Sequence, residues 1–140
     1  MQWHRVFYRI GSWAFILLGV GHLLTQWLAP RTAEQDAIHE VMRNFPVRLA
    51  GSDGNLYLYY VGFSSTMGVL LIAYGLLALA MAPLYANHLA AGRRLVALHT
   101  GVSVLTVLLS LKFFFIVPVV FMSVASLSYG LCWLLHRPTA

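Results

Sequence analysis

Apolar residues gather in four long runs, at residues 10–28, 56–82, 95–111 and 118–135, separated by shorter polar segments. An α-helix rises about 1.5 Å per residue, so runs of this length match or approach a hydrocarbon core of about 30 Å. The second run is longer than needed, which favours a tilted helix. The pattern predicts an all-α fold, a four-helix transmembrane bundle that forms one domain over residues 1–140.

A shorter helix is expected between the first and second runs, at residues 33–44. Thr32 and Gln35 have the spacing of a capping box, and the residue before Pro46 avoids the helical conformation. Apolar positions recur on one stripe of this segment, which predicts an external amphipathic helix on the membrane surface or across the end of the bundle. A lid that covers a ligand is the alternative. Residues 51–54 predict a turn.

The first run has a second interpretation, because Arg5 and Arg9 precede it as in a secretory signal peptide. The run is longer than an ordinary signal-peptide core, and Gln26-Trp27-Leu28-Ala29-Pro30 offers no small-x-small cleavage motif. We therefore expect a membrane span.

The composition excludes several classes of protein. The chain is 60% hydrophobic and 9% charged, whereas soluble domains average about 25% charged residues. The same values argue against intrinsic disorder, and the single Cys132 argues against a disulfide scaffold. The net charge of +5 comes from scattered basic residues that form no basic face, so no nucleic-acid partner is expected.

The charges predict an orientation in the membrane. All four acidic residues fall between the first two runs, together with three arginines. Segments on the other side carry basic residues only: Arg5, Arg9, Arg93, Arg94 and Arg137. The positive-inside rule then predicts a multi-pass protein of the bacterial inner (cytoplasmic) membrane with both termini cytoplasmic. Lys112 marks the opposite interface.

Small and polar residues recur at helical spacing along each run, as in helices that pack together within a membrane. The stripes are Gly11, Phe15, Gly19, His22 and Gln26 on the first run, Ser64, Gly68 and Gly75 on the second, His99, Ser103, Thr106 and Ser110 on the third, and Ser123, Ser126 and Gly130 on the fourth.

Counting helical rise from the middle of each run places four polar side chains at one depth, about 4 to 6 Å from the midplane: His22, Ser65 or Thr66, Thr106 and Ser123. An ionisable residue within a membrane is a functional candidate, and His22 is the one in this layer. Its alternative role is structural, with the imidazole bonded to a neighbouring hydroxyl. The candidate ligand-binding residues are His22, Gln26, Ser64, Ser65, Thr106 and Ser123.

No metal or cofactor is expected. Two axial haem ligands must lie about 4 Å apart, whereas His22 and His99 are expected at levels that differ by about 10 Å. Arg43 stands where a zinc-binding helix that begins at His39-Glu40 needs its second histidine. The runs also lack the carboxylates that a proton-driven transporter uses.

Three motifs resemble a known group of proteins. Leu18-Gly19-Val20-Gly21-His22, the segment 60–68, and Phe114-Phe115-Ile116-Val117-Pro118 are similar to small four-helix bacterial inner-membrane proteins of DoxX-like architecture. The resemblance implies a helical bundle in the inner membrane and no particular reaction. Because such proteins have been linked to redox and quinone contexts, it also implies a quinone-like molecule as a conceivable ligand.

The expected function is that of a small integral membrane protein with a non-enzymatic interaction or accessory-subunit role. Its expected partners are membrane lipids and either further copies of itself, as a homo-oligomer, or a larger membrane complex. The alternative is a binding protein or enzyme for an apolar lipid-like or quinone-like small molecule, which would use His22 in a pocket in the outer half of the membrane.

Overall fold

The computed structural model describes residues 3–87 and 89–135. The chain is 86% helical, which confirms the all-α prediction. Four helices are long and apolar enough to cross a membrane: α1 (Trp3–Leu28), α3 (Leu56–Ala80), α5 (Leu89–Phe113) and α6 (Ile116–Leu135). Two shorter helices, α2 (Ala33–Asn44) and α4 (Ala82–Asn87), and a hairpin of β1 (Pro46–Leu49) and β2 (Ser52–Asn55) complete the order of elements.

Two helices begin earlier than their apolar runs. α1 starts at Trp3 rather than at residue 10, and α5 starts at Leu89 rather than at 95. Arg5 and Arg9 are exposed on α1, while Tyr8 and Ser12 on its opposite face are buried. The charged residues therefore shorten the apolar run, but the helix continues past them. Arg137, which contributed to the predicted orientation, lies outside the described residues.

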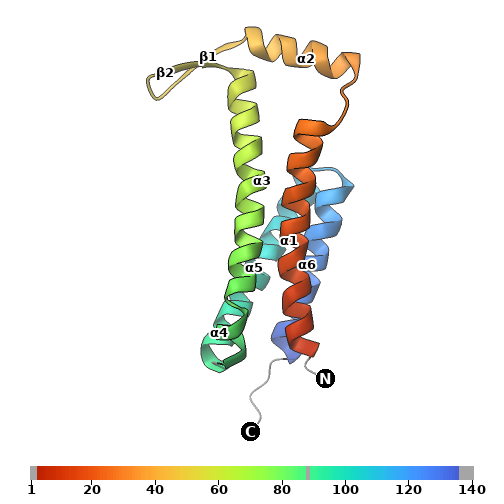
Figure 1. The fold of residues 1–140 in the computed structure, drawn as a ribbon, viewed down its shortest axis with the longest axis vertical. Helices are drawn as coiled ribbons and strands as arrows, with labels where there is room; N and C mark the ends of the chain where they lie inside the picture. The colour runs from red at the N-terminus through yellow and green to blue at the C-terminus, as the bar shows by residue number, and fades with distance from the viewer. Residues whose placement is uncertain (1–2, 88, 136–140) are drawn as a thin grey trace.

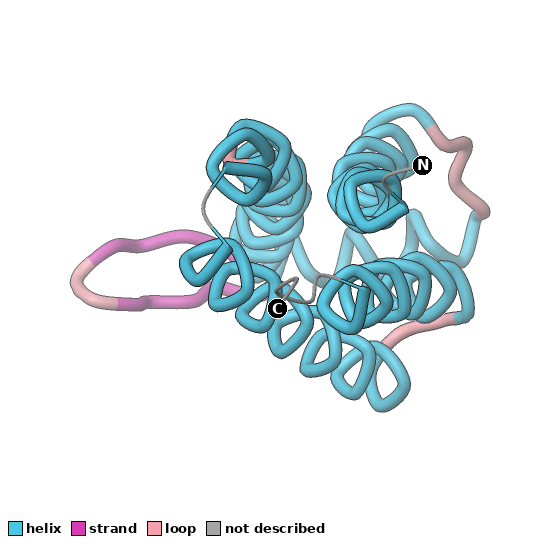
Figure 2. Tube along the Cα trace, turned by 90° about the horizontal axis from the view of Figure 1, so that it is seen from below, coloured by secondary structure: helices cyan, strands magenta, loops and turns pink. Residues whose placement is uncertain are grey.

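The long helices stand side by side, with α1 between α3 and α6, and with α5 packed on α6 (Figure 1). α1 begins and α6 ends at the end where α4 joins α3 to α5. α3 packs mainly on α1, whereas α5 packs mainly on α6. α4 lies against α5, and Figure 2 views the helices from that end. We call this the α4 end of the molecule and the other the α2 end.

Glycines bring α1 and α3 into close contact. A Cβ atom at Gly19 would lie 2.7 Å from the backbone oxygen of Gly68, and one at Gly75 would lie 2.6 Å from the backbone oxygen of Ser12. Neither contact leaves room for a side chain. The small-residue stripes on the first two runs are thus confirmed as a helix–helix interface.

α2 has the predicted bounds and the predicted cap. The backbone N–H of Gln35 donates to the Thr32 hydroxyl at 3.3 Å, and the Gln35 side chain accepts from the backbone N–H of Thr32 at 3.0 Å. The helix lies across the α2 end, above α1 and α3 (Figure 1). Arg43 lies 4.5 Å above the ring of Tyr57 on α3, and no residue of α2 is buried.

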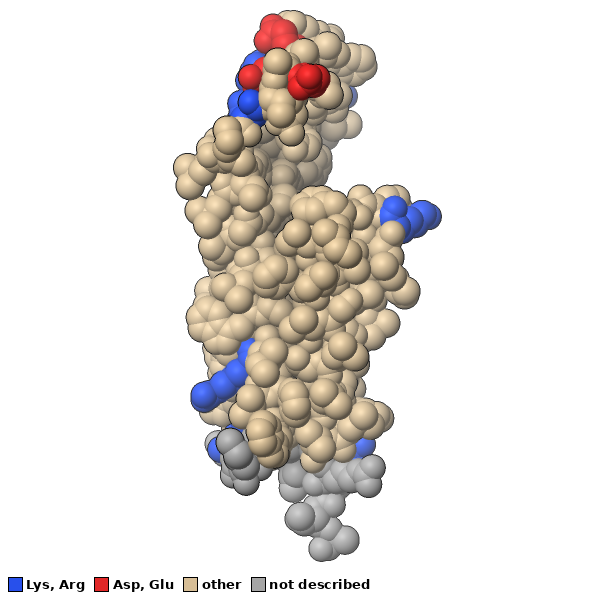
Figure 3. Space-filling view, turned by 90° about the vertical axis from the view of Figure 1, so that its right-hand side faces the viewer, with Lys and Arg blue, Asp and Glu red and all other residues tan. Residues whose placement is uncertain are grey.

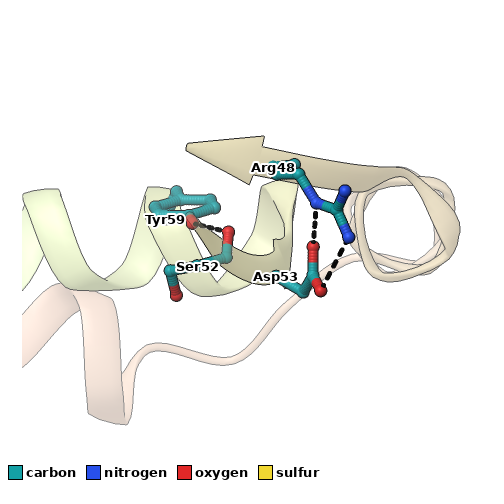
Figure 4. A network of polar contacts seen from close by, with 4 residues as sticks. All are labelled: Arg48, Ser52, Asp53 and Tyr59. Carbon is teal, nitrogen blue, oxygen red and sulfur yellow. Dashed lines mark hydrogen bonds and ion pairs between the residues drawn. The ribbon is translucent and has the colours of Figure 1, made fainter. Parts of the chain in front are cut away.

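The structure differs from the sequence prediction after α2, where a hairpin replaces the expected turn at 51–54. Ala50 and Gly51 form its turn, with φ values of 49° and 83°. Positive φ at both positions matches the right-handed twist of the paired strands. Arg48 and Asp53 face each other across the strands, with Nε to carboxylate oxygen at 2.6 Å (Figure 4), and the guanidinium lowers the pKa of Asp53. Each strand has only four residues, too few for alternation to stand out, and β2 contains no apolar residue, so periodicity did not reveal them.

Charge is divided between the two ends. Figure 3 shows the acidic side chains gathered at the α2 end and a broad, mostly uncharged surface below it. Among the described residues, both ion pairs also lie at the α2 end, Arg43 with Glu40 and Arg48 with Asp53. The basic residues of the α4 end have no acidic residue nearby in the sequence.

Candidate functional site

The four long helices are apolar outside and bury a small set of polar side chains within an otherwise apolar core. Leu70, Leu105 and Leu127 expose 62%, 58% and 69% of their surface. The buried polar residues in the described part of the chain are Ser12, His99, Ser103, Ser110 and Ser128. Soluble proteins rarely expose apolar surface of this extent. The polar side chains of the long helices therefore meet one another between the helices.

A buried cluster of aromatic and polar side chains lies between the helices near the α4 end. Five helices contribute to it, with Tyr8 and Ser12 from α1, Tyr74 from α3, Tyr85 from α4, His99 from α5, and Tyr129 and Cys132 from α6. We call this set the tyrosine–histidine cluster.

His99 lies at the centre of the cluster and has a polar partner at each ring nitrogen. Nδ1 is 2.6 Å from the Tyr74 hydroxyl, and Nε2 is 3.3 Å from the Tyr8 hydroxyl. Tyr8 donates its only hydroxyl proton to the backbone oxygen of Ala78, at 2.9 Å. Its oxygen then accepts from Nε2–H. In a neutral imidazole, which carries a single N–H, Nδ1 then accepts from the Tyr74 hydroxyl.

Tyr129 and Ser12 extend the cluster by the same logic. Ser12 donates its hydroxyl proton to the backbone oxygen of Tyr8 at 3.0 Å, so the Tyr129 hydroxyl must donate to Ser12, also at 3.0 Å. The Tyr129 ring stacks on the imidazole of His99, with centroids 4.9 Å apart. A Cβ at Gly11 would lie 2.9 Å from the Tyr129 ring, so this glycine makes the space for the tyrosine.

Tyr85 connects the cluster to the short helix α4. Its ring stacks on Tyr8 at 4.9 Å and 5°, and its hydroxyl oxygen accepts from the Cys132 thiol at 3.2 Å. Burial raises the pKa of the Tyr85 phenol above its ordinary value. The cluster thus joins all four long helices and α4 through hydrogen bonds among its own members.

Four of the predicted site residues come together, between α1 and α3. His22 Nε2 donates to the backbone oxygen of Ser64 at 3.0 Å and lies 2.9 Å from its hydroxyl, which in turn donates to the Gln26 side chain at 2.7 Å. The Gln26 amide donates to Ser65 at 3.1 Å. His22 is therefore bonded to a neighbouring hydroxyl, as its structural interpretation requires. We call these four residues the His22 clamp.

The other two predicted residues lie apart from the His22 clamp. Thr106 donates to the backbone oxygen of Ser103 on its own helix, at 2.8 Å, and Ser123 is half-buried on α6. Tyr8 contacts His99, which fixes the relative levels of α1 and α5. Helical rise from this contact places His22 about 21 Å towards the α2 end, but Thr106 only about 10 Å.

Ser123 lies at nearly the level of Thr106, about 9 Å of helical rise from Tyr129. A single polar layer is therefore not formed, because the helices are offset along their axes. Midpoints of apolar runs ignore this offset. His22 and His99 are likewise about 21 Å apart in level, farther than the sequence suggested.

Two hollows adjoin α1 near the α4 end. A cavity of 560 Å³ lies between the start of α1 and the junction of α3 with α4, and its walls include Arg5, Arg9 and Tyr85. An apolar groove of 610 Å³ lies between α1 and α6, with Ile10 and Phe121 among its lining residues. Arg9 and Trp13 line both. Sequence reasoning did not identify either hollow.

Most of the tyrosine–histidine cluster was also missed. Tyr8 lay before the predicted start of the first span, and isolated tyrosines are commonly taken for residues of the membrane interface. One signal was available, since Tyr129 and Cys132 follow Met122 and Ala125 at helical spacing and all four are buried. Within residues 3–87 and 89–135, no three His, Cys, Asp or Glu residues are grouped to hold a metal ion.

Comparison of the chain with models of protein families, with curated proteins and with solved structures found no match.

Proposed function

We propose that this chain is a multi-pass protein of the bacterial inner membrane, with α1, α3, α5 and α6 crossing the bilayer and the α4 end in the cytoplasm. The apolar exterior of the four long helices and the polar side chains buried between them support this placement, because lipid replaces water around the helices. The basic α4 end supports the orientation.

We further propose that its role is to bind other membrane helices, as a homo-oligomer or as an accessory subunit of a larger complex. One observation carries this proposal. Gly62 on α3, Gly101 on α5 and Gly130 on α6 face open space, with nothing within 4 Å of a Cβ placed there. Glycine weakens a helix by about 1 kcal/mol relative to alanine, and within membranes small residues let helices approach closely. A partner helix at these positions accounts for that cost.

The hydrogen bonds inside the molecule favour a non-enzymatic role. In the tyrosine–histidine cluster the imidazole, Tyr8, Tyr129 and Ser12 donate to or accept from one another. His22 is similarly bonded to Ser64. General acid–base catalysis needs a group within hydrogen-bond reach of a substrate. Groups committed to one another in a packed interior serve to align the helices instead.

The test is purification in mild detergent, followed by chemical cross-linking and measurement of mass. The proposal predicts a complex larger than one chain, and weaker association in Gly101→Leu, whose new side chain fills the open surface. Gly51→Leu is the control for a changed glycine away from the long helices: it strains the hairpin turn but is expected to leave the complex intact. A lone monomer with no co-purifying protein would contradict the proposal.

A further inference from the structure

The cavity between α1 and the α3–α4 junction contains two arginines for which the described residues provide no acidic partner. Arg5 and Arg9 are one helical turn apart and line the same 560 Å³ cavity. Like charges at this spacing repel by a few tenths of a kcal/mol in a helix. Both ion pairs of the described residues lie at the α2 end, and all four acidic side chains of the sequence fall between residues 34 and 53, so no acidic side chain neutralises this arginine pair.

The walls of the cavity indicate what kind of anion fits. Tyr8 and Tyr85 contribute stacked phenol rings, and Leu79, Pro83 and Trp13 add apolar surface. Tryptophan is typical of the level at which headgroups meet the acyl chains of a bilayer. An anion that is held by two guanidinium groups beside such a surface is expected to carry an apolar portion.

The apolar groove between α1 and α6 continues this surface. Arg9 and Trp13 line the groove as well as the cavity, and away from them the groove follows α1 to Leu17 and α6 from Val124 to Val120. From Arg9 to Leu17 the helix rises about 12 Å. An anionic group at Arg9 therefore lies at one end of the apolar groove, which is long enough to receive much of an acyl chain.

We propose that Arg5 and Arg9 bind the phosphate of an acidic membrane phospholipid whose acyl chain occupies the α1–α6 groove. This proposal rests on the membrane placement proposed above and adds a ligand class to it. Guanidinium groups bind phosphate through paired, charge-assisted hydrogen bonds, and basic pockets beside membrane helices suit acidic headgroups. Free phosphate shares the anionic chemistry but leaves the groove empty, so the adjoining groove favours the lipid.

The test compares two double variants that remove the same charge from the same end of the molecule. Arg5→Gln/Arg9→Gln changes the cavity, whereas Arg93→Gln/Arg94→Gln changes arginines that do not line it. Each full-length protein is reconstituted with equal amounts of phosphatidylglycerol and phosphatidylcholine, and the lipid retained is measured by native mass spectrometry. We expect wild type and the Arg93/Arg94 variant to retain phosphatidylglycerol preferentially, and the Arg5/Arg9 variant to lose that preference by about tenfold.

Further measurements distinguish a lipid headgroup from free phosphate, and lost lipid binding from lost folding. Val124→Trp fills the groove without changing charge and is expected to lower phosphatidylglycerol retention severalfold, and Arg5→Lys/Arg9→Lys is expected to keep part of it. Circular dichroism confirms that each variant is helical. Equal loss in both double variants, retention unchanged in Val124→Trp, or displacement of the lipid by inorganic phosphate at millimolar concentration would each overturn the proposal. These outcomes leave membrane insertion and oligomerisation unaffected, so they are distinguishable from failure of the proposed function.

Discussion

The Tyr74 hydroxyl on α3 donates a 2.6 Å hydrogen bond to Nδ1 of His99 on α5, and so joins two helices whose main packing partners differ. α3 packs on α1, and α5 packs on α6. The contact therefore links α3 to α5 at the α4 end, where α4 also connects the same two helices. The tyrosine–histidine cluster holds the helices together at this end.

Removal of that hydroxyl should weaken the fold. In Tyr74→Phe, the imidazole loses its donor and Nδ1 is left unpaired in a buried site, so we expect the free energy of unfolding to fall by about 1–2 kcal/mol. Equilibrium unfolding in mixed micelles measures the change. Tyr60→Phe, on an exposed position of the same helix, is the control and should stay within about 0.5 kcal/mol of wild type. Equal losses in the two variants would contradict the role given to Tyr74.

Glycine substitutions should differ sharply between contacted and open positions. Gly75→Ala places a Cβ 2.6 Å from the backbone oxygen of Ser12, so α1 and α3 must separate, and we expect destabilisation of about 2 kcal/mol or more. Gly62→Ala on the same helix meets open space and should be neutral or slightly stabilising for the isolated chain. Thermal unfolding of the two purified variants in one detergent is the comparison. The same tolerance at both positions would mean that the helices do not approach as described.

The His22 clamp predicts a stability effect rather than loss of a ligand. His22→Ala removes the donor to Ser64, while the hydrogen bond between Ser64 and Gln26 remains, and should lower the free energy of unfolding by about 1 kcal/mol. We expect the apolar molecules that co-purify with the protein to be unchanged, as measured by mass spectrometry of extracted lipids and quinones. Unaltered stability together with loss of one bound molecule would instead support a ligand site at His22.

The hairpin turn offers a substitution that should stabilise the protein. Ala50 has a φ of 49°, a region that costs an L-residue about 1–2 kcal/mol and glycine little. Ala50→Gly is therefore expected to increase the protection of the hairpin amides from hydrogen exchange, with a net gain of about 0.5–1 kcal/mol after the larger chain entropy of glycine. Gly51→Ala, at φ 83°, is the reciprocal control and should reduce protection.

What the sequence predicted well was local. Thr32, Gln35 and Pro46 lie within a few residues of the ends of α2, so capping and steric rules placed both of its bounds. The offset between helices depends on contacts such as Tyr8 with His99, which are 91 residues apart, and no local rule supplies it. The stripes that contain His22 and Ser64 do face each other. Thr106 and Ser123, in contrast, were expected at the level of His22 but lie nearer the α4 end.

The start of α1 illustrates a second limit. Hydropathy locates the part of a helix that suits a lipid core, whereas helix bounds depend on backbone hydrogen bonds that continue past Arg9 and Arg5. Tyr8 was therefore left outside the predicted span, and with it the connection from α1 to the tyrosine–histidine cluster.

The most direct test of the proposed placement is the accessibility of single cysteines on the two sides of α3. Cys132 is the only cysteine and is buried, so the wild-type chain serves as the blank. Asp53→Cys and Arg94→Cys are expressed separately in bacterial spheroplasts and treated with a membrane-impermeant maleimide. We predict that Asp53→Cys is labelled in intact spheroplasts and Arg94→Cys only after permeabilisation. Labelling of both without permeabilisation, or the reverse pattern, would contradict the account.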